Sequence, residues 1–139
     1  MQHTMRRRTF LFAATGMGLS FLWRSYGLWP ALRQPATAIE RLAGALDHQE
    51  SAAVIGRAYA QAFPLEASPR LLAALLVERI PGGLGAVSSG SETQVRELLR
   101  HSIAEDFSNL EIVVLHGWVF ARTEGRLCAL TALRDGAAA

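Results

Sequence analysis

The sequence predicts a small, mainly α-helical domain with one extended strand or β-ribbon near its C-terminus. Apolar residues recur at helical spacing in several segments between Ile39 and Leu133, as expected of helices that bury one face. One run, residues 111–120 (EIVVLHGWVF), is rich in β-branched and aromatic residues, which favours a strand. With 139 residues and 50% hydrophobic composition, the chain is long enough for one domain with an ordinary core.

Two predicted helices open the domain. Residues 39–46 read as a short amphipathic helix, and a second helix starts at Asp47-His48-Gln49-Glu50. In that start, Asp47 and Glu50 have the spacing of a capping box, in which each side chain satisfies a free backbone amide. We expect the second helix to end at Pro64, because proline cannot continue the hydrogen-bond ladder.

The third predicted helix is followed by a predicted loop. Ser68 and Pro69 suit the cap and the first turn of a helix, and a broad leucine stripe continues to Ile80. Residues 81–91 (PGGLGAVSSGS) are rich in glycine and serine, which predicts a flexible loop. This loop lacks the lysine and the glycine spacing of a phosphate-binding loop.

Ser91 and Gln94 form a second capping-box pattern, which predicts a helix that closes at Ser108-Asn109. The expected buried face is Val95, Leu98, Leu99, Ile103 and Phe107, and the expected wet face is Arg96, Glu97, Arg100, Glu105 and Asp106. A last helix is predicted over residues 123–133, with its leucines pointing inward.

No second strand is evident to pair with residues 111–120, which Gly117 interrupts as at a bend or bulge. The run therefore pairs with an unrecognised strand, lies buried as an extended segment, or leaves an open edge on which another chain docks. Trp118, Arg122 and Arg126 are the candidate interface residues, because Trp and Arg are enriched at interface hot spots. We favour the alternative in which Trp118 fills the core beside the last helix.

Positive charge is concentrated at the N-terminus. All 14 basic residues are arginines, and five of them precede residue 39, where no acidic residue occurs. From Ile39 onward, 9 arginines face 12 acidic residues. Since a basic patch is the electrostatic signature of nucleic-acid binding, we expect no nucleic-acid partner for this domain.

Residues 1–38 have the layout of an export leader, which leaves residues 39–139 as a single helix-rich domain. After three arginines, residues 9–23 form an uncharged run of 15. Signal peptides carry roughly 7–15 apolar residues at this place, whereas a membrane-spanning helix needs about 20. Ala36-Thr37-Ala38 is an A-x-A element, after which a signal peptidase cuts.

The segment Arg7-Arg8-Thr9-Phe10-Leu11 resembles the twin-arginine motif of bacterial Tat signal peptides, with Arg7 and Arg8 as the paired arginines and Phe10 and Leu11 as the apolar pair. Arg6 and Phe12 depart from the residues common at their positions. The resemblance implies recognition by the Tat translocase and a periplasmic or extracytoplasmic domain. If the leader is not cleaved, it would instead anchor the domain to the inner membrane.

No pattern in residues 39–139 predicts catalysis, a cofactor or a metal site. His48, His101 and His116 are widely spaced and form no H-x-x-H pair, and no G-x-S-x-G nucleophile motif occurs. Adjacent carboxylates such as Glu105 and Asp106 point apart on a helix. The single cysteine, Cys128, lies in an apolar run and is expected to be buried and inert.

These observations favour an exported accessory protein, or a small subunit of a periplasmic redox enzyme, without catalysis of its own and with a larger enzyme subunit as its partner. Small Tat-signalled subunits of membrane-associated flavin dehydrogenases are similar in size and layout, an analogy without a shared motif in the mature region. A free-standing periplasmic binding or structural domain is the alternative, and a small enzyme is the third reading.

Overall fold

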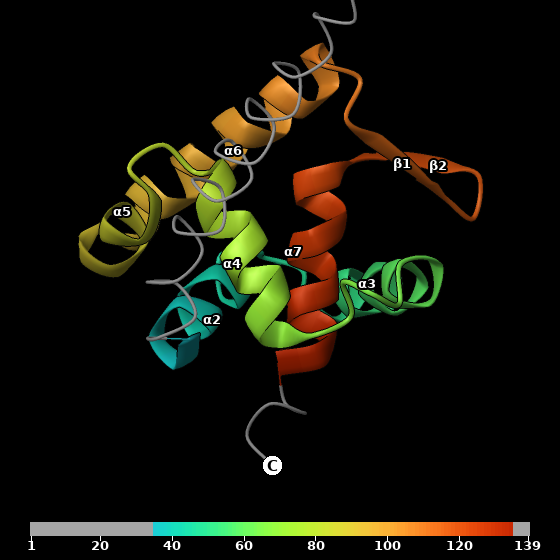
Figure 1. Cartoon of the computed structure of the whole chain (residues 1–139), viewed down its shortest axis with the longest axis horizontal. Coiled ribbons are helices and arrows are strands. Elements are labelled where there is room, and N and C mark those ends of the chain that lie inside the picture. Colours follow the sequence, from blue (N-terminus) through green and yellow to red (C-terminus); the bar gives the residue numbers. More distant parts are fainter. Residues whose placement is uncertain (1–34, 135–139) are drawn as a thin grey trace, which may run out of the picture.

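The computed structural model describes residues 35–134. Helices dominate this part of the chain, and two short strands form one antiparallel sheet near its end (Figure 1). The fold class expected from the sequence, helical with a C-terminal β-ribbon, is confirmed. In chain order the elements are α2 (Pro35–Ala43), α3 (Gln49–Ala62), α4 (Pro69–Arg79), α5 (Gly83–Ser89), α6 (Glu92–Ser108), β1 (Ile112–Leu115), β2 (Trp118–Ala121) and α7 (Arg122–Leu133).

Helix α7 lies at the centre of the helices and contacts α2, α3, α4 and α6 (Figure 1). Its closest neighbour is α3, because glycines let the two backbones approach. A Cβ atom added to Gly56 of α3 would lie 2.0 Å from the carbonyl oxygen of Cys128, and one added to Gly125 of α7 would lie 2.6 Å from the Tyr59 ring. Around this contact, apolar side chains of α2, α4, α6 and α7 form the core, among them Leu42, Leu72, Leu76, Val95, Leu127 and Leu130.

Of the two capping boxes predicted at helix starts, one is present in the structure and the other is not. At α6 the capping box is present, since the Ser91 hydroxyl accepts from the Gln94 amide and the Gln94 side chain accepts from the Ser91 amide. At α3 the predicted capping box is wrong, because the helix begins at Gln49 and no side chain caps it. Asp47 instead pairs with Arg96 of α6 at 3.0 Å.

The predicted loop at residues 81–91 is wrong, because its central part forms helix α5. Gly82 and Gly83 adopt positive φ angles of 83° and 56° and turn the chain between α4 and α5. Val87 of α5 is fully buried, and Arg41 of α2 donates hydrogen bonds to the carbonyl oxygens of Val87 and Gly90. Tertiary packing thus orders a segment whose glycine and serine content favours a loop.

The missing strand partner is supplied by the same run of residues, which folds back on itself as a β-hairpin. Val114 lies opposite Val119, and Leu115 opposite Trp118. The two residues between the strands, His116 and Gly117, have positive φ angles of 51° and 81°, as a type I′ turn requires. Gly117 therefore marks a turn rather than a bend within one long strand.

Candidate interaction surface

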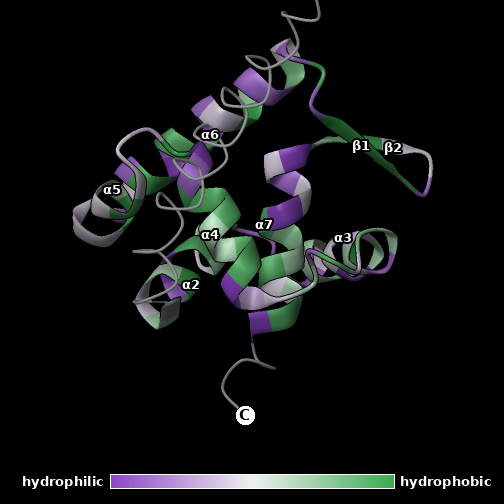
Figure 2. Cartoon of the chain, in the orientation of Figure 1, coloured by the Kyte–Doolittle hydropathy of each residue, from purple (hydrophilic) through white to green (hydrophobic). Residues whose placement is uncertain are grey.

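The hairpin projects from the helices, and most of its strand residues are apolar (Figures 1 and 2). Several of these side chains are exposed and form a candidate interaction surface. We call it the hairpin patch. Two of its members, Phe107 and Leu110, lie where α6 leads into the hairpin, and the others lie on the strands. The hairpin patch consists of Phe107, Leu110, Ile112, Val114, Trp118 and Val119, all exposed.

The two faces of the hairpin differ in burial. Residues opposite each other across an antiparallel pair share a face. One face holds Val113 and Leu115, which are both buried, and also Trp118, which lies opposite Leu115 beside the turn and is exposed. The other face holds the opposed pair Val114 and Val119, whose side chains are 64% and 53% exposed. The solvent-facing side of the hairpin therefore carries apolar side chains. An antiparallel sheet with one buried face usually has polar side chains on its other face.

The expectation that Trp118 fills the core is wrong, because its side chain is 73% exposed. Trp118 directly follows the turn and lies opposite Leu115, at the end of the hairpin farthest from α7. The helices cover Leu115 but leave the indole uncovered. Of the predicted interface residues, Trp118 is thus the one that is available to a partner.

Leu110 is strained as well as exposed. It has a φ angle of 57° and is 79% exposed. This left-handed conformation costs most side chains about 1 kcal/mol or more, and glycine is the usual residue at such a helix end. A large apolar side chain here stabilises neither the local backbone nor the core.

Arg122 and Arg126 are bound within the protein. Arg126 donates two hydrogen bonds to the carboxylate of Glu66, at 2.9 Å and 3.0 Å, and Arg122 donates one at 2.8 Å. Arg122 also stacks over the Phe63 ring, with 4.4 Å between the guanidinium carbon and the ring centroid. These arginines fasten the turn after α3 to the start of α7.

Tyr59 completes this cluster by donating its hydroxyl to Glu66 at 2.6 Å. Burial alone would raise the pKa of Glu66, but hydrogen bonds from Arg126, Tyr59 and Arg122 outweigh it and lower the pKa to about 2. Burial, together with the hydrogen bond to Glu66, raises the pKa of Tyr59 to about 12. The carboxylate is therefore charged and the phenol neutral at every physiological pH.

Asp106, expected on the wet face of its helix, is buried and only 1% exposed. It forms an ion pair with Arg79 of α4 and accepts a hydrogen bond from the backbone amide of Thr123. Its neighbour Glu105 is exposed and lies 3.6 Å from His101. The two carboxylates do point apart, but they have different environments.

The other chemistry-bearing residues stay apart. His48, His101 and His116 are exposed, and they lie before α3, within α6 and in the hairpin turn, respectively. Within residues 35–134, no three His, Cys, Asp or Glu side chains come close enough to hold a metal ion. Cys128 is buried, as expected, and burial raises the pKa of its thiol to about 12. A thiol in this state is a poor nucleophile.

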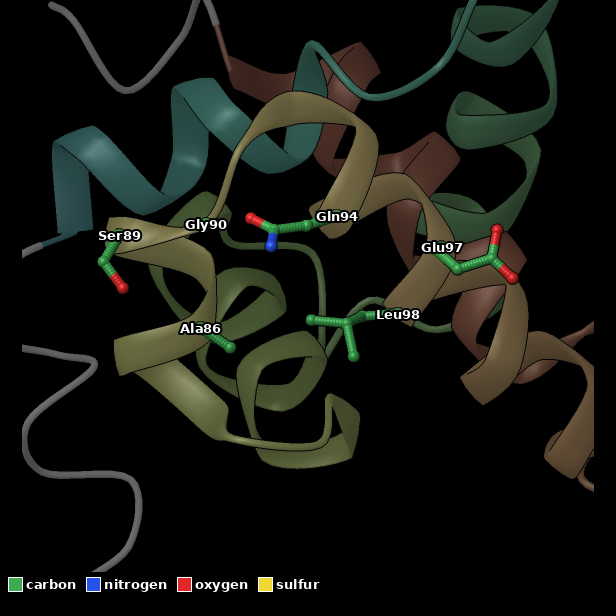
Figure 3. A pocket seen from close by; sticks show the side chains of 6 residues that line it. All are labelled: Ala86, Ser89, Gly90, Gln94, Glu97 and Leu98. Carbon is green, nitrogen blue, oxygen red and sulfur yellow. The ribbon is translucent and has the colours of Figure 1, made fainter.

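An open groove of about 530 Å³ lies between α5 and α6. Gln94 and Leu98 face this space, whereas the carboxylate of Glu97 points away from it (Figure 3). Its polar groups are partly occupied, since the Gln94 side chain caps α6 and the Ser89 hydroxyl donates to the carbonyl of Gly85. The groove therefore offers few free groups with which to orient a ligand.

The predicted export signal, Arg7, Arg8, Phe10 and Leu11, lies outside the described residues. Ala36 and Ala38, the predicted peptidase site, lie in the first turn of α2, with Ala36 exposed and Ala38 buried. Within residues 35–134, no single helix is long and apolar enough to cross a membrane; α4 and α5 meet those criteria only together, with a bend of 103° between them.

Comparisons with protein-family models, with curated proteins and with solved structures find no match to this chain.

Proposed function

We propose that this chain is an exported accessory protein, or a small subunit of a periplasmic enzyme, that acts by binding a partner protein through the hairpin patch and has no catalysis of its own. The observation that carries the proposal is the exposure of Trp118, Val114 and Val119 on an uncharged hairpin. A group of large exposed apolar side chains on one projecting element is a common mark of a protein interface.

The composition of the hairpin patch suggests that its residues serve to bind a partner and not to stabilise the domain. Natural proteins protect exposed strands with charges or proline, yet β1 and β2 contain neither. Leu110 adds an exposed apolar side chain at a position where glycine would relieve strain. Because exposed apolar side chains gain little stability from burial within the chain, a partner that covers them accounts for their presence.

The resemblance of the leader to Tat signals supports the proposal that the protein is exported. The Tat route carries cargo that has folded before export, so a folded subunit and its partner can be exported as one complex. A partner enzyme without its own signal would explain why a domain with no evident cofactor ligands uses this route.

The alternative, a free-standing periplasmic binding domain, is favoured by one observation, the groove between α5 and α6. A small ligand bound there would contact Leu98 and Ala86 and the side chain of Gln94. This alternative predicts that Leu98→Trp, which fills the groove, abolishes ligand binding without affecting any protein complex.

Purification of the exported chain from its native host, with and without a disrupted hairpin patch, tests the proposal. Val119→Arg and Val114→Arg place a charge on the outward face, and Leu65→Arg is a matched control, because Leu65 is 92% exposed and lies outside the patch. We expect the parent and the Leu65→Arg variant to co-purify with one enzyme subunit in fixed stoichiometry, and both valine variants to lose it. A monomeric parent, or a complex that survives both valine substitutions, would overturn the proposal.

A further inference from the structure

The first turn of α2 is part of the hydrophobic core. Ala38 is 1% exposed, Ile39 is 5% exposed and Leu42 is fully buried. Helix α2 packs against α4, α5 and α7, so these side chains lie between α2 and the rest of the domain. The peptide bond between Ala38 and Ile39, at which the A-x-A element predicts cleavage, is therefore inside a packed helix.

Helix α2 is also held by hydrogen bonds in its C-terminal half. Arg41 donates to the carbonyl oxygens of Val87 and Gly90. The Gln49 side chain donates to the carbonyl oxygens of Ala43 and Leu46. These bonds hold α2 beside α5 and close the turn that follows α2.

Proteolysis requires an exposed segment that can be drawn out of regular structure. To present the bond after Ala38, the chain would have to unwind the first turn of α2 and withdraw Ala38 and Ile39 from the core. Cleavage would also remove Ala38 from the core, so the cut chain would lose part of the packing between α2 and the rest of the domain.

We propose that the chain is not cut after Ala38, and that any processing falls before helix α2 (Pro35–Ala43). The exported protein then retains all of α2. This proposal uses the export step of the proposed function and is independent of the hairpin patch.

Intact-mass analysis of the exported chain, tagged at its C-terminus, tests the proposal. We expect an N-terminus at or before Pro35. Ala36→Leu provides the matched variant, because a large residue disrupts the A-x-A element while Ala36 is exposed on α2. The parent and this variant should have the same N-terminus. An N-terminus between residues 36 and 39 in the parent would overturn the proposal.

A second experiment does not require export. It therefore tests whether the bond after Ala38 is protected even if the chain is not a Tat substrate. The purified full chain is treated with an elastase-type protease, which cuts after small residues, and the products are identified by N-terminal sequencing. Ala67, in the exposed turn between α3 and α4, is the internal control. We expect no cut after Ala38 under native conditions while Ala67 is cut, and cutting at both once the chain is unfolded. Native cutting after Ala38 as fast as after Ala67 would overturn the proposal.

Discussion

The carboxylate of Asp106 accepts a hydrogen bond from the backbone amide of Thr123 at 2.6 Å, so a side chain of α6 caps the start of α7. The N-cap residue of α7 is Ala121, which offers no side-chain acceptor. The other carboxylate oxygen of Asp106 pairs with Arg79 at the end of α4. One buried carboxylate thereby joins three helices and sets the position from which α7 starts.

Asp106→Asn should destabilise the protein by about 1.5–3 kcal/mol, the usual worth of a hydrogen bond to a charged group, because the amide cannot serve both Arg79 and Thr123 as a charged acceptor. Urea unfolding at neutral pH would measure the change. Glu105→Gln, on the exposed neighbour, is the control and should change the free energy of unfolding by less than about 0.5 kcal/mol. Equal effects of the two substitutions would contradict the capping role.

Gly56→Ala should destabilise the protein by about 1–3 kcal/mol or more, because the new methyl group would meet the Cys128 carbonyl oxygen at 2.0 Å. The backbones of α3 and α7 would have to move apart. Gly85→Ala is the matched control, since no atom lies within 4 Å of its added Cβ, and it should stabilise α5 by up to about 1 kcal/mol. Thermal unfolding of both variants compares the two sites.

The cluster around Glu66 predicts acid sensitivity. The pKa of Glu66 falls from its ordinary value of 4.5 to about 2 in the folded protein, so Glu66 stabilises the fold above about pH 4.5. This contribution, at most about 3 kcal/mol and reduced by solvent screening of the partly exposed carboxylate, is lost as the pH falls from 4.5 towards 2. Glu66→Gln should remove this part of the pH dependence, as measured by urea unfolding between pH 7 and pH 2.5. A variant with the parent's pH profile would refute the assignment.

Trp118→Ala should change the free energy of unfolding by less than about 0.5 kcal/mol, as is usual for surface positions. Its cross-strand neighbour Leu115 is buried, and Leu115→Ala should cost about 2–5 kcal/mol. Thermal melts of the two variants would therefore differ by many degrees. A large loss of stability from Trp118→Ala would mean that the indole packs against the domain and is not free to bind a partner.

Arg7→Lys combined with Arg8→Lys should block export, because the paired arginines are the defining residues of the motif that the leader resembles. Cell fractionation with a C-terminally tagged chain would measure the periplasmic fraction. An Arg6→Lys variant, altered beside the pair, should be exported normally. An undiminished periplasmic yield of the double variant would eliminate the Tat assignment.

Local sequence patterns determined where most helices lie in this protein. Pro69 and the Ser91–Gln94 capping box mark the starts of α4 and α6, and Pro64 follows the end of α3. These signals depend on backbone geometry and on hydrogen bonds between residues a few positions apart. They can be read from the sequence because they do not depend on the rest of the fold.

Tertiary structure alone decided the rest, because burial depends on what lies opposite a residue. Asp106 sits on a polar stretch of α6, yet the positions of Arg79 and Thr123 make it a buried cap. Trp118 belongs to an apolar run, yet the turn at His116 and Gly117 carries it beyond the helices. Helix α5 forms from a loop-like sequence because Val87 finds a place in the core and Arg41 binds its carbonyl oxygens. For Asp106 and for α5 the deciding partners lie on other helices, and no periodicity within a single segment encodes them.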